Sequence, residues 1–230
     1  MQNFFRIGSH DPEVYGVRLQ QGYTVGGTAV TNTIFQGRNR TSYRLLAGVF
    51  GRKPISFTLT YQGRTERECA LQRSMVEGWM WGKVELYLPT GFWYTSTLTS
   101  IGEATREGVD GVQVLMHVQY DFEGVQHDPL VTVKNAAAGF WNPGTLPYAD
   151  CICSVTVGAA ADTYQLAGAT FQNVTQGEQL TVDGINGRLL RNGAPAPGNV
   201  TFIKFPTVTP GENKFSATDP VTVQYYPCYM

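Results

Sequence analysis

The chain has 230 residues, of which 42% are apolar and 15% are charged, against about 25% charged residues in an average soluble domain. Residues 1–133 carry 12 basic and 12 acidic residues, and residues 134–230 carry 5 and 6. Neither part has the excess of cations that binding nucleic-acid phosphates requires. The sequence has no apolar run of 18 residues that could span a membrane, and its first twelve residues lack the apolar stretch of a secretory signal.

The segment 15–53 shows little periodicity. It contains Arg38, Arg40 and Arg44 among glycine, threonine and asparagine residues. Long irregular segments of this kind that leave a compact domain are usually either functional or disordered. We interpret the segment as a long loop or an extended hairpin.

Period-two alternation dominates the segment that follows, apart from one helix. Apolar residues alternate with polar ones over 55–61, 84–88 and 112–122, and 92–101 predicts a further strand. This pattern is typical of strands with one buried face. Between them, Thr65 and Glu68 have the spacing of a capping box. Leu71, Met75 and Trp79 recur every fourth residue, and Val76 and Met80 widen this apolar stripe, which is expected to face the core. We expect a helix at about 65–80.

The composition changes at 134–150. This segment contains two prolines and two glycines, and it has almost no charged residues. We interpret 134–150 as a linker between a β domain at 1–133 and a second domain at 151–230. In the second domain, Cys151, Cys153, Val155 and Val157 alternate along one strand, and Asn192-Gly193 is one of several turn signals. A small β-sandwich is expected there.

The sequence contains none of the common catalytic or phosphate-binding motifs. Asp121 and Glu123 share a strand face with His117, which would suit acid–base catalysis, but alternation alone explains that face. Cys151, Cys153 and Cys228 lack the usual zinc spacing, so they are expected to be free thiols. We predict no catalytic residue, no metal site and no cofactor.

Aromatic residues offer an alternative to a purely structural role. Trp93 with Tyr94, and Phe140 with Trp141, could stack on a sugar ring, although exposed aromatic residues serve protein interfaces equally well. The histidines His10 and His127 precede Asp-Pro pairs and are interpreted as turn residues.

Three runs resemble the N-terminal domain of the distal tail proteins of siphovirus-type phages. They are Trp81-Gly-Lys-Val-Glu-Leu-Tyr-Leu-Pro, Phe92-Trp-Tyr-Thr-Ser-Thr-Leu-Thr-Ser-Ile-Gly and Val118-Gln-Tyr-Asp-Phe-Glu-Gly-Val-Gln-His-Asp-Pro-Leu. The stretch that includes Leu180-Thr-Val-Asp-Gly-Ile-Asn-Gly and Val221-Thr-Val-Gln-Tyr-Tyr-Pro is similar to the second domain of that family.

The resemblance implies a mainly β protein with one helix, with an N-terminal ring-forming domain and a C-terminal galectin-like β-sandwich. It implies a homohexameric ring that joins the tail tube protein to tail-tip and receptor-binding proteins and leaves a channel for DNA. Such a protein is made in the host cytoplasm and resides at the virion tail tip, as part of a phage or prophage. It is not an enzyme, inserts in no membrane and binds no specific nucleic-acid sequence.

A closed ring needs two different complementary surfaces on each copy. Our hypothesis is that residues 23–54 form an arm that contacts the neighbouring copy, with Phe35, Arg38 and Arg40 near the contact. Two other functions stay open from the sequence: a carbohydrate-binding protein that contacts the host surface, and a hydrolase of the tail tip.

Overall fold

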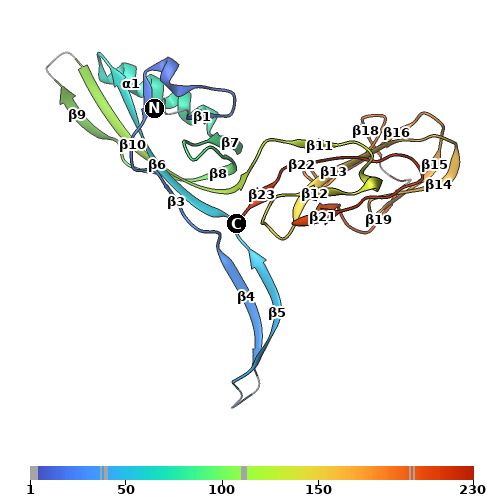
Figure 1. The fold of residues 1–230 in the computed structure, drawn as a ribbon. Helices are drawn as coiled ribbons and strands as arrows, with labels where there is room; N and C mark the ends of the chain where they lie inside the picture. The colour runs from blue at the N-terminus through green and yellow to red at the C-terminus, as the bar shows by residue number, and fades with distance from the viewer. Residues whose placement is uncertain (1–4, 37, 39–40, 110–112, 197, 199) are drawn as a thin grey trace. The chain divides into compact units, whose positions relative to one another are not determined.

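The computed structural model describes residues 5–36, 38, 41–109, 113–196, 198 and 200–230, and it divides the chain into two compact units. Residues 1–126 and Met230 belong to the first unit, and residues 127–229 to the second. Strands dominate both units, and the described residues contain a single α-helix (Figure 1). The expectation of a mainly β chain with one helix is therefore confirmed. Over the same residues, no helix has the length and apolar character needed to cross a membrane.

The first unit is built on an antiparallel sheet with the strand order β1-β7-β8-β10-β6-β2, to which β3 adds at β6 and β9 at β10. Its elements are β1 (Arg6–Ile7), η1 (Pro12–Tyr15), β2 (Val17–Leu19), β3 (Thr24–Val25), β4 (Val30–Gln36), β5 (Tyr43–Phe50), β6 (Lys53–Gly63), α1 (Glu66–Trp79), β7 (Lys83–Tyr87), β8 (Trp93–Ile101), β9 (Thr105–Val109) and β10 (Gln113–His127).

The long central pair β6 and β10 shows why this sheet has one buried face. Leu59 lies opposite Val118, and Phe57 lies opposite Tyr120. All four side chains are buried in one core, whereas their polar neighbours in both strands alternate to the other face. The alternation in the sequence thus predicted both strands and their buried face correctly. Val112, the first residue of the predicted strand, lies outside the described residues.

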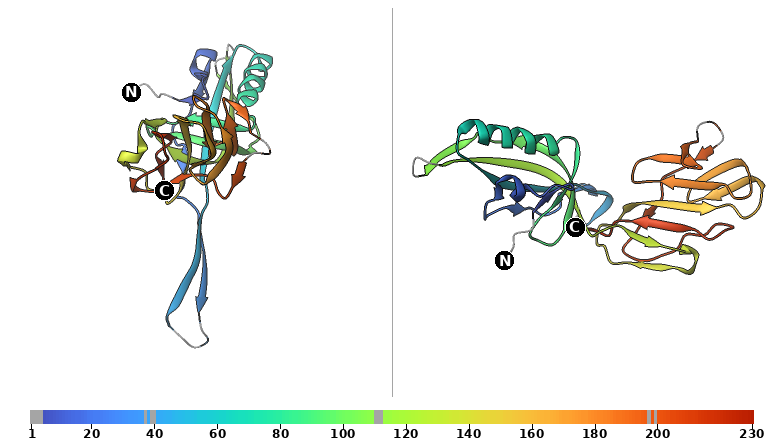
Figure 2. Two further views of the ribbon diagram at one scale, coloured as in Figure 1. Left: turned by 90° about the vertical axis from the view of Figure 1, so that its right-hand side faces the viewer. Right: turned by 90° about the horizontal axis from the view of Figure 1, so that it is seen from above.

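Helix α1 covers the apolar face of this sheet (Figure 2). The Thr65 hydroxyl accepts a hydrogen bond from the Glu68 amide at 3.2 Å, and the Glu68 carboxylate accepts one from the Arg64 amide at 2.6 Å. The first bond satisfies an amide that the first turn of a helix leaves free. Thr65 thus caps the helix as predicted, whereas the Glu68 carboxylate binds the amide one residue before the one that a capping box uses. The helix predicted at 65–80 is observed at Glu66–Trp79.

The buried stripe of α1 differs from the predicted one. Val76 and Met80 are fully buried as predicted, but so is Cys69, which was not predicted, whereas Leu71 is 62% exposed. Met75 and Trp79 are partly buried and pack against the core. Each residue turns the helix by about 100°, so Leu71 lies on nearly the opposite side of the helix from Cys69. The prediction that Leu71 faces the core was therefore wrong.

A buried polar network fixes α1 on the sheet. The Tyr61 and Tyr120 hydroxyls lie 2.7 Å apart, and the Tyr120 hydroxyl donates to the Glu77 carboxylate at 3.2 Å. Arg73 donates to the same carboxylate at 2.6 Å. Burial raises the pKa of both tyrosines, so they stay protonated and available as donors.

The second unit contains two sheets that share one core. The larger sheet has the strand order β11-β22-β13-β16-β17-β18, with β20 paired to β13. The smaller sheet has the order β14-β15-β19. Strands β12 and β21 pair with each other as a separate two-stranded ribbon. Its elements are β11 (Val131–Val133), η2 (Ala136–Ala138), β12 (Phe140–Asn142), β13 (Ala149–Thr156), β14 (Ala161–Leu166), β15 (Ala169–Val174), β16 (Gln179–Asp183), β17 (Arg188–Arg191), β18 (Ala194–Pro195), β19 (Val200–Phe202), β20 (Thr207–Val208), β21 (Gly211–Asn213), β22 (Thr222–Tyr225) and β23 (Cys228–Tyr229).

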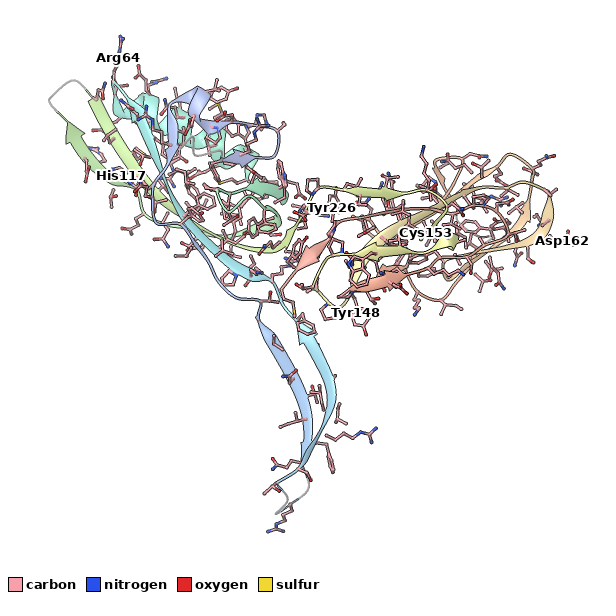
Figure 3. All side chains as sticks on the ribbon, viewed as in Figure 1. Arg64, His117, Tyr148, Cys153, Asp162 and Tyr226 are labelled. Atoms are coloured by element: carbon pink, nitrogen blue, oxygen red, sulfur yellow. The ribbon has the colours of Figure 1, made fainter. Side chains whose placement is uncertain are left out.

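Side chains from both sheets meet in this core. Cys153 and Val182 come from the larger sheet, and Tyr164 and Phe171 from the smaller one. Figure 3 marks Cys153 within the unit. The predicted Asn192-Gly193 turn joins β17 to β18, and both residues have positive φ angles, 49° and 77°, as a two-residue hairpin requires.

The boundary between the units lies before the segment that we interpreted as a linker. Contacts divide the chain after Gln126, and residues 134–150 belong to the second unit. That segment contains η2 and β12, and Ala136 is fully buried in the second core. The local composition of 134–150 resembles a linker because its turns need proline and glycine, but its backbone is held by segments more than 70 residues away, such as β21.

Candidate functional site

The candidate site is the hairpin formed by β4 and β5. Strand β3 still pairs with β6, but beyond it β4 pairs only with β5, in a two-stranded sheet of its own. The hairpin therefore extends past the sheet of the first unit (Figure 1). The interpretation of 15–53 as an extended hairpin is correct for β4 and β5. We call these two strands and their connection the arm.

Close backbone contacts fix the base of the arm. The Gly26 amide donates to the Pro54 carbonyl at 2.8 Å, and the Gly51 amide donates to the Ala29 carbonyl at 2.6 Å. A Cβ atom on Gly26 would lie 2.6 Å from the Pro54 ring, so only glycine fits at this position. Beside it, burial lowers the pKa of Lys53, whose ammonium donates to the Gln126 side chain at 2.8 Å.

The arm exposes an unusual amount of apolar surface. Seven of the eighteen large apolar side chains that are exposed among the described residues belong to these two short strands. They are Val30, Ile34, Phe35, Leu45, Leu46, Val49 and Phe50. A lone two-stranded hairpin is at best marginally stable in water, and its two outer edges carry unpaired backbone groups. Both properties are typical of a segment that binds another protein.

The register divides these side chains between two faces. Directly opposite residues of an antiparallel pair share a face. Val30 lies opposite Phe50, and Ile34 lies opposite Leu45, so these four form one apolar face, interrupted by Asn32 and Gly48. We call this the apolar face of the arm. The other face carries Thr31, Thr33 and Phe35 of β4, which lie opposite Val49, Ala47 and Arg44 of β5.

The residues predicted for this contact have different outcomes. Phe35 is exposed and lies opposite Arg44, on the face that carries the threonines. Arg38 lies in the turn and is exposed. Arg40 lies outside the described residues. Ile34 and Leu45 were not among the predicted contact residues. The register shifts after Thr33, so that Leu46 is an extra residue in β5 and the alternation that would place Leu45 on the face of Ile34 is broken.

The carboxylates considered for catalysis lie on the polar face of β10. Asp121 accepts a hydrogen bond from Gln119 at 3.0 Å. His117, marked in Figure 3, contacts Gln20 at 2.6 Å, Thr60 at 2.9 Å and the Glu107 carboxylate at 3.5 Å. A polar hollow of about 430 Å³ lies beside His117. These side chains mainly contact one another, as the polar face of an amphipathic strand does.

The cysteines occupy structural positions. Cys151 and Cys153 are fully buried in the second core, where a hydrogen bond between the two thiols, together with burial, raises the pKa of Cys151. Cys228 donates to the Tyr226 carbonyl at 3.2 Å. No cluster of three or more histidine, cysteine, aspartate or glutamate residues that could hold a metal is found in the part of the chain that the structure describes.

The two histidines that we interpret as turn residues both contact other groups of the protein. The His10 ring stacks on Trp79 with centroids 4.4 Å apart. His127 is buried, and its Nδ1 lies 2.8 Å from the Asp128 carbonyl.

No protein-family model matches the chain, and no curated protein matches its sequence. Solved structures do match its fold. The crystal structure of the Dit protein of phage SPP1, described as a paradigm of the hub adsorption apparatus in phages that infect Gram-positive hosts, has a TM-score of 0.71. The match covers 99% of this chain and 100% of that one at 13% identity. The chain has the Dit fold.

Two further matches come from structures of the phage p2 baseplate in its activated conformation. The structure with Sr has a TM-score of 0.54 at 11% identity and covers 96% of this chain and 97% of that one. The structure with Ca has a TM-score of 0.54 at 12% identity and covers 98% of each chain. The Dit fold thus accounts for both units of the chain and leaves no segment of appreciable length unmatched.

Proposed function

We propose that this chain is a structural component of a phage or prophage tail tip, a hexameric ring adaptor that joins the tail tube to tip proteins. The observation that carries the proposal is the match to the Dit protein of phage SPP1 over the full length of both chains. Coverage matters here because a β-sandwich alone is compatible with many functions. A match that includes both units in the same order favours one common architecture.

The arm supplies the contact between copies in this proposal. A closed ring uses head-to-tail interfaces, in which one surface of a copy meets a different surface of the next. The arm is suited to the first role because its large apolar side chains are exposed and, among the described residues, β4 and β5 pair only with each other. We propose that it packs on the first unit of the neighbouring copy, with Phe35, Arg38 and Arg40 near the contact.

The remaining parts of the proposal concern partners and location. The first unit surrounds a channel for DNA. Residues 1–126 carry 12 basic and 11 acidic residues, which is no substantial excess of cations that would retain DNA. The second unit, which we propose to be galectin-like, contributes surface to tail-tip and receptor-binding proteins. The assembled ring resides at the virion tail tip after synthesis in the host cytoplasm.

Particle mass in solution tests the ring directly. Light scattering of the purified full chain should give about six times the chain mass of 25.3 kDa. A chain that stays single at high concentration, and that joins no tail tube or tip protein, would refute the proposal. A variant without residues 33–42 tests the arm separately: it should fold and remain small, and closed rings of this variant would exclude the arm contact while leaving the ring itself intact.

A further inference from the structure

The ribbon of β12 and β21 presents an exposed tryptophan in the second unit. Trp141 is 68% exposed, although both of its neighbours in β12 are at least partly buried. It lies directly opposite Glu212, so the two side chains share the outward face of the ribbon. Lys214 follows two residues after Glu212 and is also exposed. An indole ring, a carboxylate and an ammonium group therefore lie on one surface.

The backbone that carries Trp141 is firmly held. The Phe140 ring packs between Phe215 and Tyr225, with centroids 6.3 and 5.5 Å away. The Tyr225 hydroxyl donates to the Trp141 carbonyl at 3.3 Å. On the other side, the buried Asn142 side chain donates to the Thr209 carbonyl at 3.1 Å. The backbone position of Trp141 is thus fixed by contacts on both sides of it in the sequence.

Gly211 of β21 lies beside the indole ring of Trp141. A Cβ atom built on Gly211 would lie 3.8 Å from two carbons of this ring. Because Trp141 is 68% exposed, most of the ring is accessible to a ligand. An indole has only two side-chain torsions, so it loses little conformational freedom when a ligand stacks on it.

The tryptophan borders a hollow of about 510 Å³, lined by Ala138, Gly139, Phe140, Trp141, Glu212, Asn213 and Lys214. Small-molecule sites usually span about 300–1,000 Å³, whereas protein interfaces bury extended surfaces of about 800 Å² on each partner. Glu212 and Lys214 take part in none of the ion pairs formed between described residues. Their hydrogen-bonding capacity is therefore directed toward solvent, whereas the Asn213 amide is bound to the Thr209 and Gly211 carbonyls.

We propose that this hollow binds a hexopyranose unit of a glycan. A pyranose has a face of C–H groups that stacks on an indole, and hydroxyl groups at its rim that donate to a carboxylate and accept from an ammonium. Trp141 supplies the stacking surface, Glu212 accepts from the hydroxyls and Lys214 donates to them. This binding is a second activity beside ring assembly and does not depend on it.

Saturation-transfer NMR on the full chain tests the site, because the method works for monomers and for large rings. The probes are methyl β-D-glucopyranoside, methyl β-D-galactopyranoside and methyl N-acetyl-β-D-glucosaminide, each up to about 50 mM, which covers millimolar dissociation constants. At least one probe should receive saturation through its C–H face. Trp141→Ala should weaken that binding at least tenfold, and Glu212→Gln should weaken it more modestly.

Trp81→Ala is the matched control, because Trp81 is 88% exposed but belongs to the first unit. This variant should bind the probes as the unaltered chain does. Circular dichroism of each variant establishes that it is folded. The proposal is overturned if no probe receives saturation, or if Trp141→Ala and Trp81→Ala reduce it equally. It is also overturned if Trp141→Ala leaves sugar binding intact and abolishes only co-assembly with a tail protein, since the surface would then be a protein interface.

Discussion

The apolar face of the arm gives a quantitative prediction about assembly. We expect the double substitution Ile34→Thr and Leu45→Thr to weaken association between copies without destabilising the chain. Threonine suits a strand as well as isoleucine does, so the hairpin itself should persist. The two side chains lie opposite each other and are 51% and 55% exposed.

The magnitude follows from these exposed fractions. Complete burial of an isoleucine or leucine side chain contributes about 1.5–3 kcal/mol, so burying the exposed half of each contributes about 1 kcal/mol. Loss of both contacts should cost about 2 kcal/mol per interface, which corresponds to an association constant about 30-fold lower. Because a ring contains one such contact per copy, the effect accumulates around it. The stability of the single chain should change by less than about 0.5 kcal/mol, as for other surface substitutions.

Sedimentation velocity over a concentration series measures this effect, and urea denaturation followed by circular dichroism measures the stability of the chain. Ile203→Thr is the control, because Ile203 is 83% exposed but belongs to the second unit. The reasoning is refuted if the double variant assembles at the same concentration as the unaltered chain. An equal loss of assembly in the control would show that general surface hydrophobicity, and not the arm, drives association.

Two further predictions concern stability. Tyr120→Phe should destabilise the first unit by about 1–3 kcal/mol, because it removes the hydroxyl that joins the buried Tyr61 to Glu77. Tryptophan fluorescence during urea denaturation measures this loss of stability. An unchanged midpoint would contradict a stabilising role for the hydrogen bonds of Tyr120. In the second unit, the Arg191 guanidinium binds the Glu178 carboxylate at 2.8 Å and holds its pKa below the ordinary 4.5. Because the folded pKa is the lower one, this stabilisation is complete above about pH 4.5 and is lost as pH falls through the folded pKa. Glu178→Gln should therefore destabilise the second unit by about 2 kcal/mol at pH 7 and by much less at pH 3. Thermal unfolding at the two pH values measures this difference. An equal loss of stability at both pH values would exclude a role for the charge of Glu178.

Local patterns determined much of the first unit. The alternation over 55–61 predicted β6, and that over 112–122 predicted β10, because a strand with one buried face imposes its period on the residues themselves. The capping-box spacing at Thr65 predicted the start of α1 for a similar reason, since the hydrogen bond that caps the helix connects residues within a single turn. Cys151 and Cys153 were likewise expected to be free thiols; both are free and fully buried in the second core.

Tertiary structure decided the features that depend on distant partners. Leu71 and Cys69 both fit a helical stripe, and only the packing of α1 on the sheet buries Cys69 and exposes Leu71. The apolar face of the arm was hidden because a bulge breaks the alternation of β5. The sequence indicated that Trp141 could stack on a sugar ring, but it did not indicate which residues surround it. Glu212 is 71 positions away, and the pairing of β12 with β21 brings the two residues together. A sequence displays interactions between near neighbours directly, whereas a contact between distant segments exists only after the chain has folded.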